Sequence, residues 1–144
     1  MDSNLKRSIM IENYQDPINK KSVNDDSFIK IHHKSESCID DIVLYVKIKD
    51  DKIIDMYFDG EACVISTSAT SIMIKSLIGK SLNEALDVME NYYNMIGEVD
   101  YDKQVLGELN VYDEISKQPN RIKCATLPFD TLKKVINIYE ENKH

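Results

Sequence analysis

The sequence predicts an α+β fold that contains a three-stranded antiparallel sheet. Apolar and polar residues alternate in residues 28–34, 42–48 and 52–58, and this period of two is typical of strands with one buried face. Only Asp50 and Asp51 separate the second strand from the third, which is the length of a tight hairpin. Other segments repeat their apolar residues at helical spacing, so we expect helices beside the sheet.

Four segments carry helix signals. The clearest starts with a capping box at residues 81–84 and stops at Gly97. The others are residues 4–13, a helix that Ser66 or Ser68 caps and Gly79 ends, and a C-terminal helix with an apolar stripe from Leu127 to Tyr139. Pro128 lies in the C-terminal helix, and we expect it in the first turn, where a helix tolerates proline.

The stretch from Glu98 to Gln118 is acidic and only weakly patterned. We expect it on the surface, with short helical turns.

Length and composition indicate one compact, soluble globular domain over residues 1–144. Of the residues, 42% are hydrophobic and 30% are charged, which is ordinary for such a domain. The formal net charge of −7 would repel nucleic-acid phosphates and anionic lipid surfaces, so we expect neither nucleic acid nor a membrane as partner.

The N-terminus lacks the apolar core of a signal peptide, and no stretch approaches the ~20 apolar residues of a membrane span. These features favour a cytoplasmic protein. The three cysteines cannot all pair within one chain, and a reducing compartment would keep them as thiols. We therefore expect Cys38, Cys63 and Cys124 to be free or metal-bound.

The predicted sheet brings two of the cysteines to one end. In an up-down-up meander, the connection after strand one and the exit from strand three share an end of the sheet. Cys38 lies in the first of these segments and Cys63 in the second. Cys124 joins them if the last helix starts over the same end.

Three thiolates leave a tetrahedral divalent ion one ligand short, and Asp40 lies two residues after Cys38. The residue types predict a site of Cys38, Asp40, Cys63 and Cys124, with zinc preferred over iron for a closed tetrahedron. Such a site carries a formal charge of −2, which Arg121 or Lys123 could offset.

Simpler interpretations exist for each residue. Free cysteines are often small core residues, and these three lack the CxxC spacing of many metal sites. Asp40, Arg121 and Lys123 could simply be solvated. We expect His32 and His33 to be structural, because adjacent strand residues face opposite sides of a sheet.

The segments DGEACVISTSATS, GKS and NRIKCATLPFDTLKKVI resemble the U-type iron–sulfur assembly proteins, the IscU/NifU N-terminal-like family. The early segment MIENYQDPINKK is similar as well, so the likeness covers nearly the whole chain. Lys123 precedes Cys124 where the IscU branch has histidine. That lysine, Arg121 and the acidic segment 98–118 resemble the SufU branch.

The resemblance implies a compact SufE/IscU-like fold with helices packed on the sheet, and a metal site at the same four residues. It further implies that Cys38 accepts sulfur as a persulfide from a SufS-type cysteine desulfurase, while Asp40, Cys63 and Cys124 retain zinc. Arg121 would place positive charge near the opening. Downstream iron–sulfur assembly proteins would receive the sulfur.

The chain departs from the family pattern at Ile39, where a glycine is usual between cysteine and aspartate. A β-branched residue resists positive φ, so the loop that carries Cys38 and Asp40 is expected to differ. Two other functions stay open: a scaffold for a [2Fe-2S] cluster, which uses the same ligands, and an interaction adaptor whose cysteines are core residues.

Overall fold

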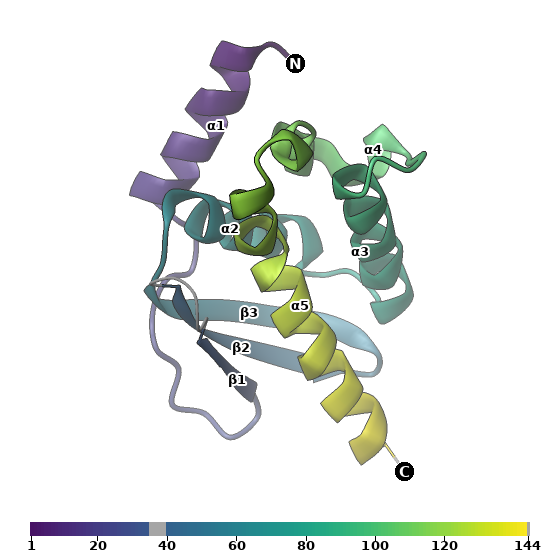
Figure 1. Cartoon of the computed structure of the whole chain (residues 1–144). Coiled ribbons are helices and arrows are strands. Elements are labelled where there is room, and N and C mark those ends of the chain that lie inside the picture. Colours follow the sequence, from purple (N-terminus) through teal and green to yellow (C-terminus); the bar gives the residue numbers. More distant parts are fainter. Residues whose placement is uncertain (35–39, 144) are drawn as a thin grey trace.

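The computed structural model describes residues 1–34 and 40–143, and these form an α+β fold (Figure 1). Its sheet has the order β1-β2-β3, with β1 at Ile29–Lys34, β2 at Asp41–Lys49 and β3 at Lys52–Glu61. Both strand pairs are antiparallel. The predicted three-stranded meander is therefore confirmed.

The helices gather on one side of the sheet (Figure 1). They are α1 at Ser3–Gln15, α2 at Val64–Leu77, α3 at Leu82–Ile96, α4 at Lys103–Leu106 and α5 at Pro119–Asn142, with short 3₁₀ segments η1 at Gly107–Tyr112 and η2 at Ile115–Lys117. Helix α2 packs against β3, and α5 packs against β1 and β2. Among the described residues, none of the helices has the length and apolar character needed to cross a bilayer.

The β2–β3 hairpin has the predicted two-residue turn. Asp50 and Asp51 have φ angles of 53° and 59°, and positive φ at both positions is what a type I′ turn requires. The Tyr139 hydroxyl donates a 2.9 Å hydrogen bond to the Asp51 carboxylate, which ties the far end of α5 to this turn.

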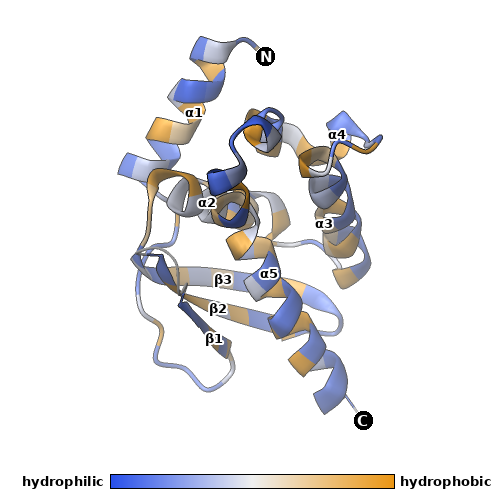
Figure 2. Ribbon diagram, in the orientation of Figure 1, coloured by the Kyte–Doolittle hydropathy of each residue, from blue (hydrophilic) through white to orange (hydrophobic). Residues whose placement is uncertain are grey.

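The core lies between the sheet and the helices. Ile42, Leu44 and Val46 of β2 are at most 1% exposed and point toward the helical side. Ile72 of α2 and Leu132 of α5 are fully buried against them. Figure 2 shows hydrophobic residues concentrated where helices and sheet meet, with hydrophilic residues at the hairpin and at the C-terminal end of α5.

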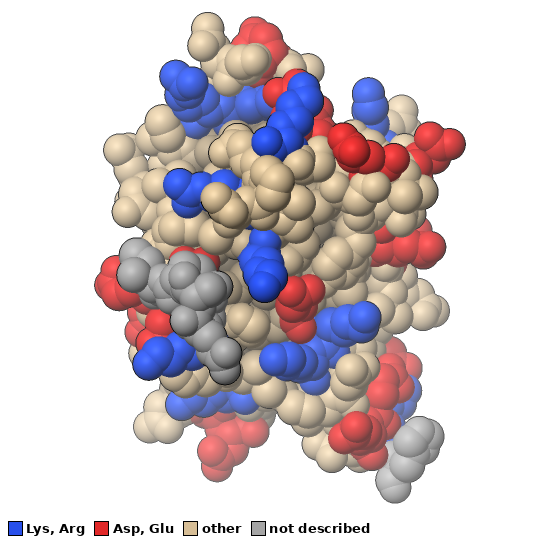
Figure 3. Space-filling view, in the orientation of Figure 1, with Lys and Arg blue, Asp and Glu red and all other residues tan. Residues whose placement is uncertain are grey.

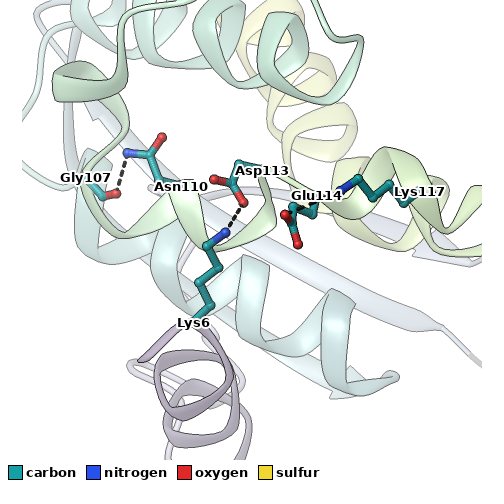
Figure 4. A network of polar contacts seen from close by, with 6 residues as sticks. All are labelled: Lys6, Gly107, Asn110, Asp113, Glu114 and Lys117. Atoms are coloured by element: carbon teal, nitrogen blue, oxygen red, sulfur yellow. Dashed lines mark hydrogen bonds and ion pairs between the residues drawn. The ribbon is translucent and has the colours of Figure 1, made fainter. Parts of the chain in front are cut away.

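The expectation that residues 98–118 lie on the surface is partly wrong. Short helical turns are present, but five of their apolar side chains are buried: Leu106, Leu109, Val111, Tyr112 and Ile115. The Lys6 ammonium donates a 2.7 Å hydrogen bond to Asp113, which ties α1 to this segment (Figure 4). The sequence did not predict this burial, because the buried apolar residues are spread over irregular turns among acidic residues and follow no single period.

The start of α5 also differs from the prediction. The helix begins at Pro119, which occupies its first turn, so Pro128 lies well inside it. The predicted apolar stripe is buried all the same, because Leu127, Leu132 and Ile136 pack into the core. The position of Pro128 affects the hydrogen bonds around Cys124, as described below.

The capping box of α3 is present as predicted. The Ser81 hydroxyl accepts from the Glu84 amide at 3.1 Å, and the Glu84 carboxylate accepts from the Ser81 amide at 3.0 Å. Replacing Ser81 with alanine is expected to lower the free energy of unfolding by about 1 kcal/mol in urea denaturation, because one helix-terminal amide loses its partner.

Ser76→Ala provides the control for that change. The Ser76 hydroxyl donates only to the Ile72 carbonyl within α2, and alanine is a better helix former than serine, so its stability should stay level or rise slightly. Equal losses in both variants would show that the Ser81 cap contributes nothing specific.

Candidate metal centre

Three of the predicted ligand residues meet at one point of the fold. Asp40 directly precedes β2, Cys63 directly precedes α2, and Cys124 lies in the second turn of α5. Their carboxylate and thiol atoms all lie within 4.8 Å of one another. Cys38 and Ile39 lie outside the described residues.

The sheet register brings Asp40 and Cys63 together. Asp41 at the start of β2 pairs with Glu61 at the end of β3, so the residues just outside these two positions leave the sheet at the same end. Gly60 makes a close approach possible there, because a Cβ atom at this position would lie 1.9 Å from the Asp41 carbonyl oxygen. Helix α5 reaches the same end by packing across α2.

Asp40 is 1% exposed and is held by two short hydrogen bonds. Its Oδ1 atom accepts from the Cys63 amide at 2.8 Å, and its Oδ2 atom accepts from the Ser66 hydroxyl at 2.6 Å. A carboxylate offers about four lone-pair directions, so an oxygen that accepts a hydrogen bond can also bind a cation. The interpretation of Asp40 as a solvated turn residue is wrong.

Cys63 is the N-cap residue of α2, and its sulfur accepts from the Ser66 amide at 3.4 Å. The prediction that Ser66 or Ser68 caps this helix is therefore wrong by one turn. The sulfur therefore lies at the N-terminal end of α2, which is the positive end of the helix dipole. A cysteine can take the place of serine as a cap because its sulfur is also an acceptor.

Cys124 is 6% exposed and lies beside the other two donors. Burial, with further contributions from Cys63 and Asp40, raises the pKa of the Cys124 thiol from its usual 9.0 to about 12. Without a cation, this environment disfavours the thiolate form of Cys124. A cation among the three groups would reverse the effect, because it stabilises the thiolate over the thiol.

The donor set fits a soft divalent metal ion. Two thiol sulfurs and one carboxylate are the ligand types that zinc and iron bind, whereas calcium and magnesium prefer all-oxygen sites. Three donors leave a tetrahedral ion one position short. The fourth predicted ligand, Cys38, falls in the segment 35–39 that the structure does not describe.

The other predicted site residues lie outside this donor group. Arg121 and Lys123 are exposed on α5, one turn and one residue before Cys124. His32 is exposed and contacts Asp41, whereas His33 is half-buried on the helical side of the sheet. Burial, followed by the Lys134 charge, lowers the pKa of His33.

Sequence reasoning missed the role of Ser66 at this site. We considered this residue only as a helix cap, although it is fully buried and bonded to Asp40. The usable signal was its position three residues after a cysteine at a helix start, which is where an N-cap side chain meets the backbone.

Comparisons with known proteins identify the family of this chain. The model of the NifU-like N terminal domain family matches residues 5–144. The zinc-dependent sulfurtransferase SufU of Bacillus subtilis is 34% identical over 131 residues, which cover 90% of this chain and 88% of that protein. The iron-sulfur cluster assembly scaffold protein IscU of Streptococcus pyogenes is 38% identical over 109 residues, covering 75% of this chain and 69% of that protein.

A solved structure shows the same fold. The crystal structure of FiSufU from Fervidobacterium islandicum superposes with a TM-score of 0.81 at 33% identity, and the match covers 92% of this chain and 97% of that one. The family model spans nearly the whole sequence, and the relatives match it over most of their own lengths. This chain is therefore a member of the NifU-like N-terminal domain family.

Proposed function

We propose that this protein serves iron–sulfur cluster assembly as a zinc-dependent acceptor and carrier of sulfur, which it takes as a persulfide from a SufS-type cysteine desulfurase. The observation that carries the proposal is the convergence of a buried carboxylate and two thiols within 4.8 Å at one end of the sheet. The likeness to a zinc-dependent sulfurtransferase over 90% of the chain supports it.

In this proposal Asp40, Cys63, Cys124 and Cys38 hold zinc. When bound, the ion stabilises the thiolate forms of its cysteine ligands at neutral pH. The role of Cys38 depends on its match to the first site cysteine of the family and on its place two residues before Asp40. Asp40, Cys63 and Cys124 are buried or half-buried, and in this proposal they keep the metal in place.

Cys38 is the proposed sulfur acceptor. Its thiolate attacks the outer sulfur of the desulfurase persulfide, a new sulfur–sulfur bond forms on Cys38, and the original bond breaks so that the desulfurase cysteine leaves as a thiolate. The hydrogen of the outer sulfur travels with it, and no external oxidant or reductant is needed. Arg121 is exposed one turn before Cys124 and supplies positive charge for the sulfur anion or for the docking partner.

The proposal predicts that Cys38→Ala abolishes sulfur acceptance but leaves the protein folded. The full chain is incubated with a SufS-type desulfurase and cysteine, and mass spectrometry counts the sulfur atoms added to it. The wild type should gain sulfur on Cys38, whereas the variant should gain none there and keep the wild-type circular dichroism spectrum. Full sulfur transfer to Cys38→Ala would exclude Cys38 as the acceptor.

The second candidate function is a scaffold on which a [2Fe-2S] cluster is assembled and passed on. The same thiol donors bind iron, and the chain is 38% identical over 109 residues to a protein named as such a scaffold. Metal analysis after anaerobic and aerobic purification separates the two functions. One tightly held zinc per chain supports the sulfur carrier, whereas labile iron with inorganic sulfide supports the scaffold.

A further inference from the structure

Ser66 contacts all three segments that carry the described ligands. It lies in the first turn of α2 and is fully buried. Its hydroxyl oxygen is 2.6 Å from the Asp40 carboxylate, 3.1 Å from the Cys124 carbonyl oxygen and 3.5 Å from the Cys63 sulfur. One side chain thus joins the start of β2, the start of α2 and the second turn of α5.

Pro128 explains why the Cys124 carbonyl is available to Ser66. Proline has no backbone N–H, so the carbonyl four residues earlier, that of Cys124, lacks its helical donor. Such a buried carbonyl needs another partner, because an unsatisfied one is costly. The Ser66 hydroxyl lies 3.1 Å from that carbonyl and can donate to it, and the Tyr92 hydroxyl donates to the next carbonyl, that of Ala125, at 2.8 Å.

The hydroxyl group of Ser66 has one hydrogen and two acceptors in reach. The Asp40 carboxylate is nearer and is the stronger acceptor where it is charged. The Cys124 carbonyl is the second acceptor, at 3.1 Å. The positions of the Asp40 carboxylate and of the Cys124 turn are therefore coupled through one buried atom.

We propose that Ser66 is the positioning residue of the metal centre: it orients the Asp40 carboxylate and holds the Cys124 turn of α5 against α2, so that the ligand atoms converge. The proposal deepens the proposed function and depends on its metal site. Groups that orient metal ligands in this way typically account for about 10- to 100-fold in metal affinity.

Ser68 offers a matched control on the same helix. It is fully buried like Ser66, but its hydroxyl donates to the Ile65 carbonyl at 3.2 Å and contacts the Tyr112 hydroxyl, and neither partner is a ligand atom. A purely structural role for a buried hydroxyl near the start of α2 would make Ser66→Ala and Ser68→Ala behave alike.

The test measures the zinc dissociation constant of the full chain by competition with a chelating dye. Ser66→Ala should weaken zinc binding by about 10- to 100-fold. Ser68→Ala should stay within about twofold of the wild type, because the Ser68 hydroxyl contacts none of the ligand atoms. In the Asp40→Ala background, Ser66→Ala should weaken zinc binding less than it does in the wild type. The two losses of affinity should differ by at least a factor of about two, as is typical of residues in contact.

Four results would overturn the proposal. Equal zinc affinities of Ser66→Ala and Ser68→Ala would reject the role of Ser66 but leave the metal site in place. The same conclusion would follow if Ser66→Ala weakened zinc binding as much in the Asp40→Ala background as in the wild type. A wild type that retains no zinc would overturn the proposed function as well. If Ser66→Ala does not fold, Ser66→Thr keeps the hydroxyl and should bind zinc more tightly than Asp40→Ala; equal weakness of these two would also reject the role.

Discussion

Replacing Cys124 with serine is expected to leave a folded protein that no longer retains stoichiometric zinc. Cys124 is 6% exposed, and its sulfur lies within 4.8 Å of the Cys63 and Asp40 donor atoms. A serine hydroxyl fills nearly the same space but does not ionise at neutral pH, so the site loses a thiolate ligand. The affinity should fall by more than about 100-fold, the upper range for residues that merely support a ligand.

The measurement is elemental analysis of the purified variant, followed by chelator competition. Thr126→Ala is the control on the same helix, because the Thr126 hydroxyl bonds only to the Lys123 carbonyl at 3.4 Å. This control should keep one zinc per chain. If Cys124→Ser and Cys63→Ser both kept the full zinc content, the metal would have to lie elsewhere.

Chelation should also lower the melting temperature of the wild type and leave that of Cys124→Ser almost unchanged. A ligand at 100 times its dissociation constant stabilises the folded state by about 2.7 kcal/mol, and its removal takes this stabilisation away. Thiols that are only core residues would give no such response. The same scan therefore tests the adaptor hypothesis, in which the cysteines bind no metal.

Replacing Gly60 with alanine is expected to destabilise the fold severely. Gly60 has a φ angle of +119°, and an added Cβ would lie 1.9 Å from the Asp41 carbonyl oxygen and 3.2 Å from the Ile42 Cα. Both neighbours are backbone atoms of the paired strand, so no flexible side chain can move aside. Backbone strain and overpacking each cost about 1–3 kcal/mol, together a large part of a typical stability of about 5–15 kcal/mol.

Gly79→Ala separates the two causes. Gly79 also has positive φ, at +88°, but an added Cβ there meets nothing within 4 Å. It should therefore lose only about 1 kcal/mol from backbone strain, against several for Gly60→Ala, in urea denaturation. Because Asp41 follows Asp40, Gly60→Ala should also weaken metal binding. Similar losses of stability in the two variants would show that the close approach at Gly60 is not essential.

The sequence by itself determined the local elements of this protein. Alternation with a period of two located the three strands, Asp50 and Asp51 marked the turn, and the capping box located the start of α3. Each of these signals arises from residues a few positions apart, whose side chains share one face or one turn. The sequence also indicated the ligands of the candidate site, because a set of thiolates with one carboxylate favours zinc or iron over calcium or magnesium.

Only the tertiary structure decided which of these residues meet and how they are held. The burial of segment 98–118, the cap at Cys63 and the start of α5 at Pro119 all result from packing between distant parts of the chain. The contact from Ser66 to the Cys124 carbonyl spans 58 positions and exists because Pro128 leaves that carbonyl without a helical donor. No local period encodes such a contact, since it depends on how α2, α5 and the sheet pack together.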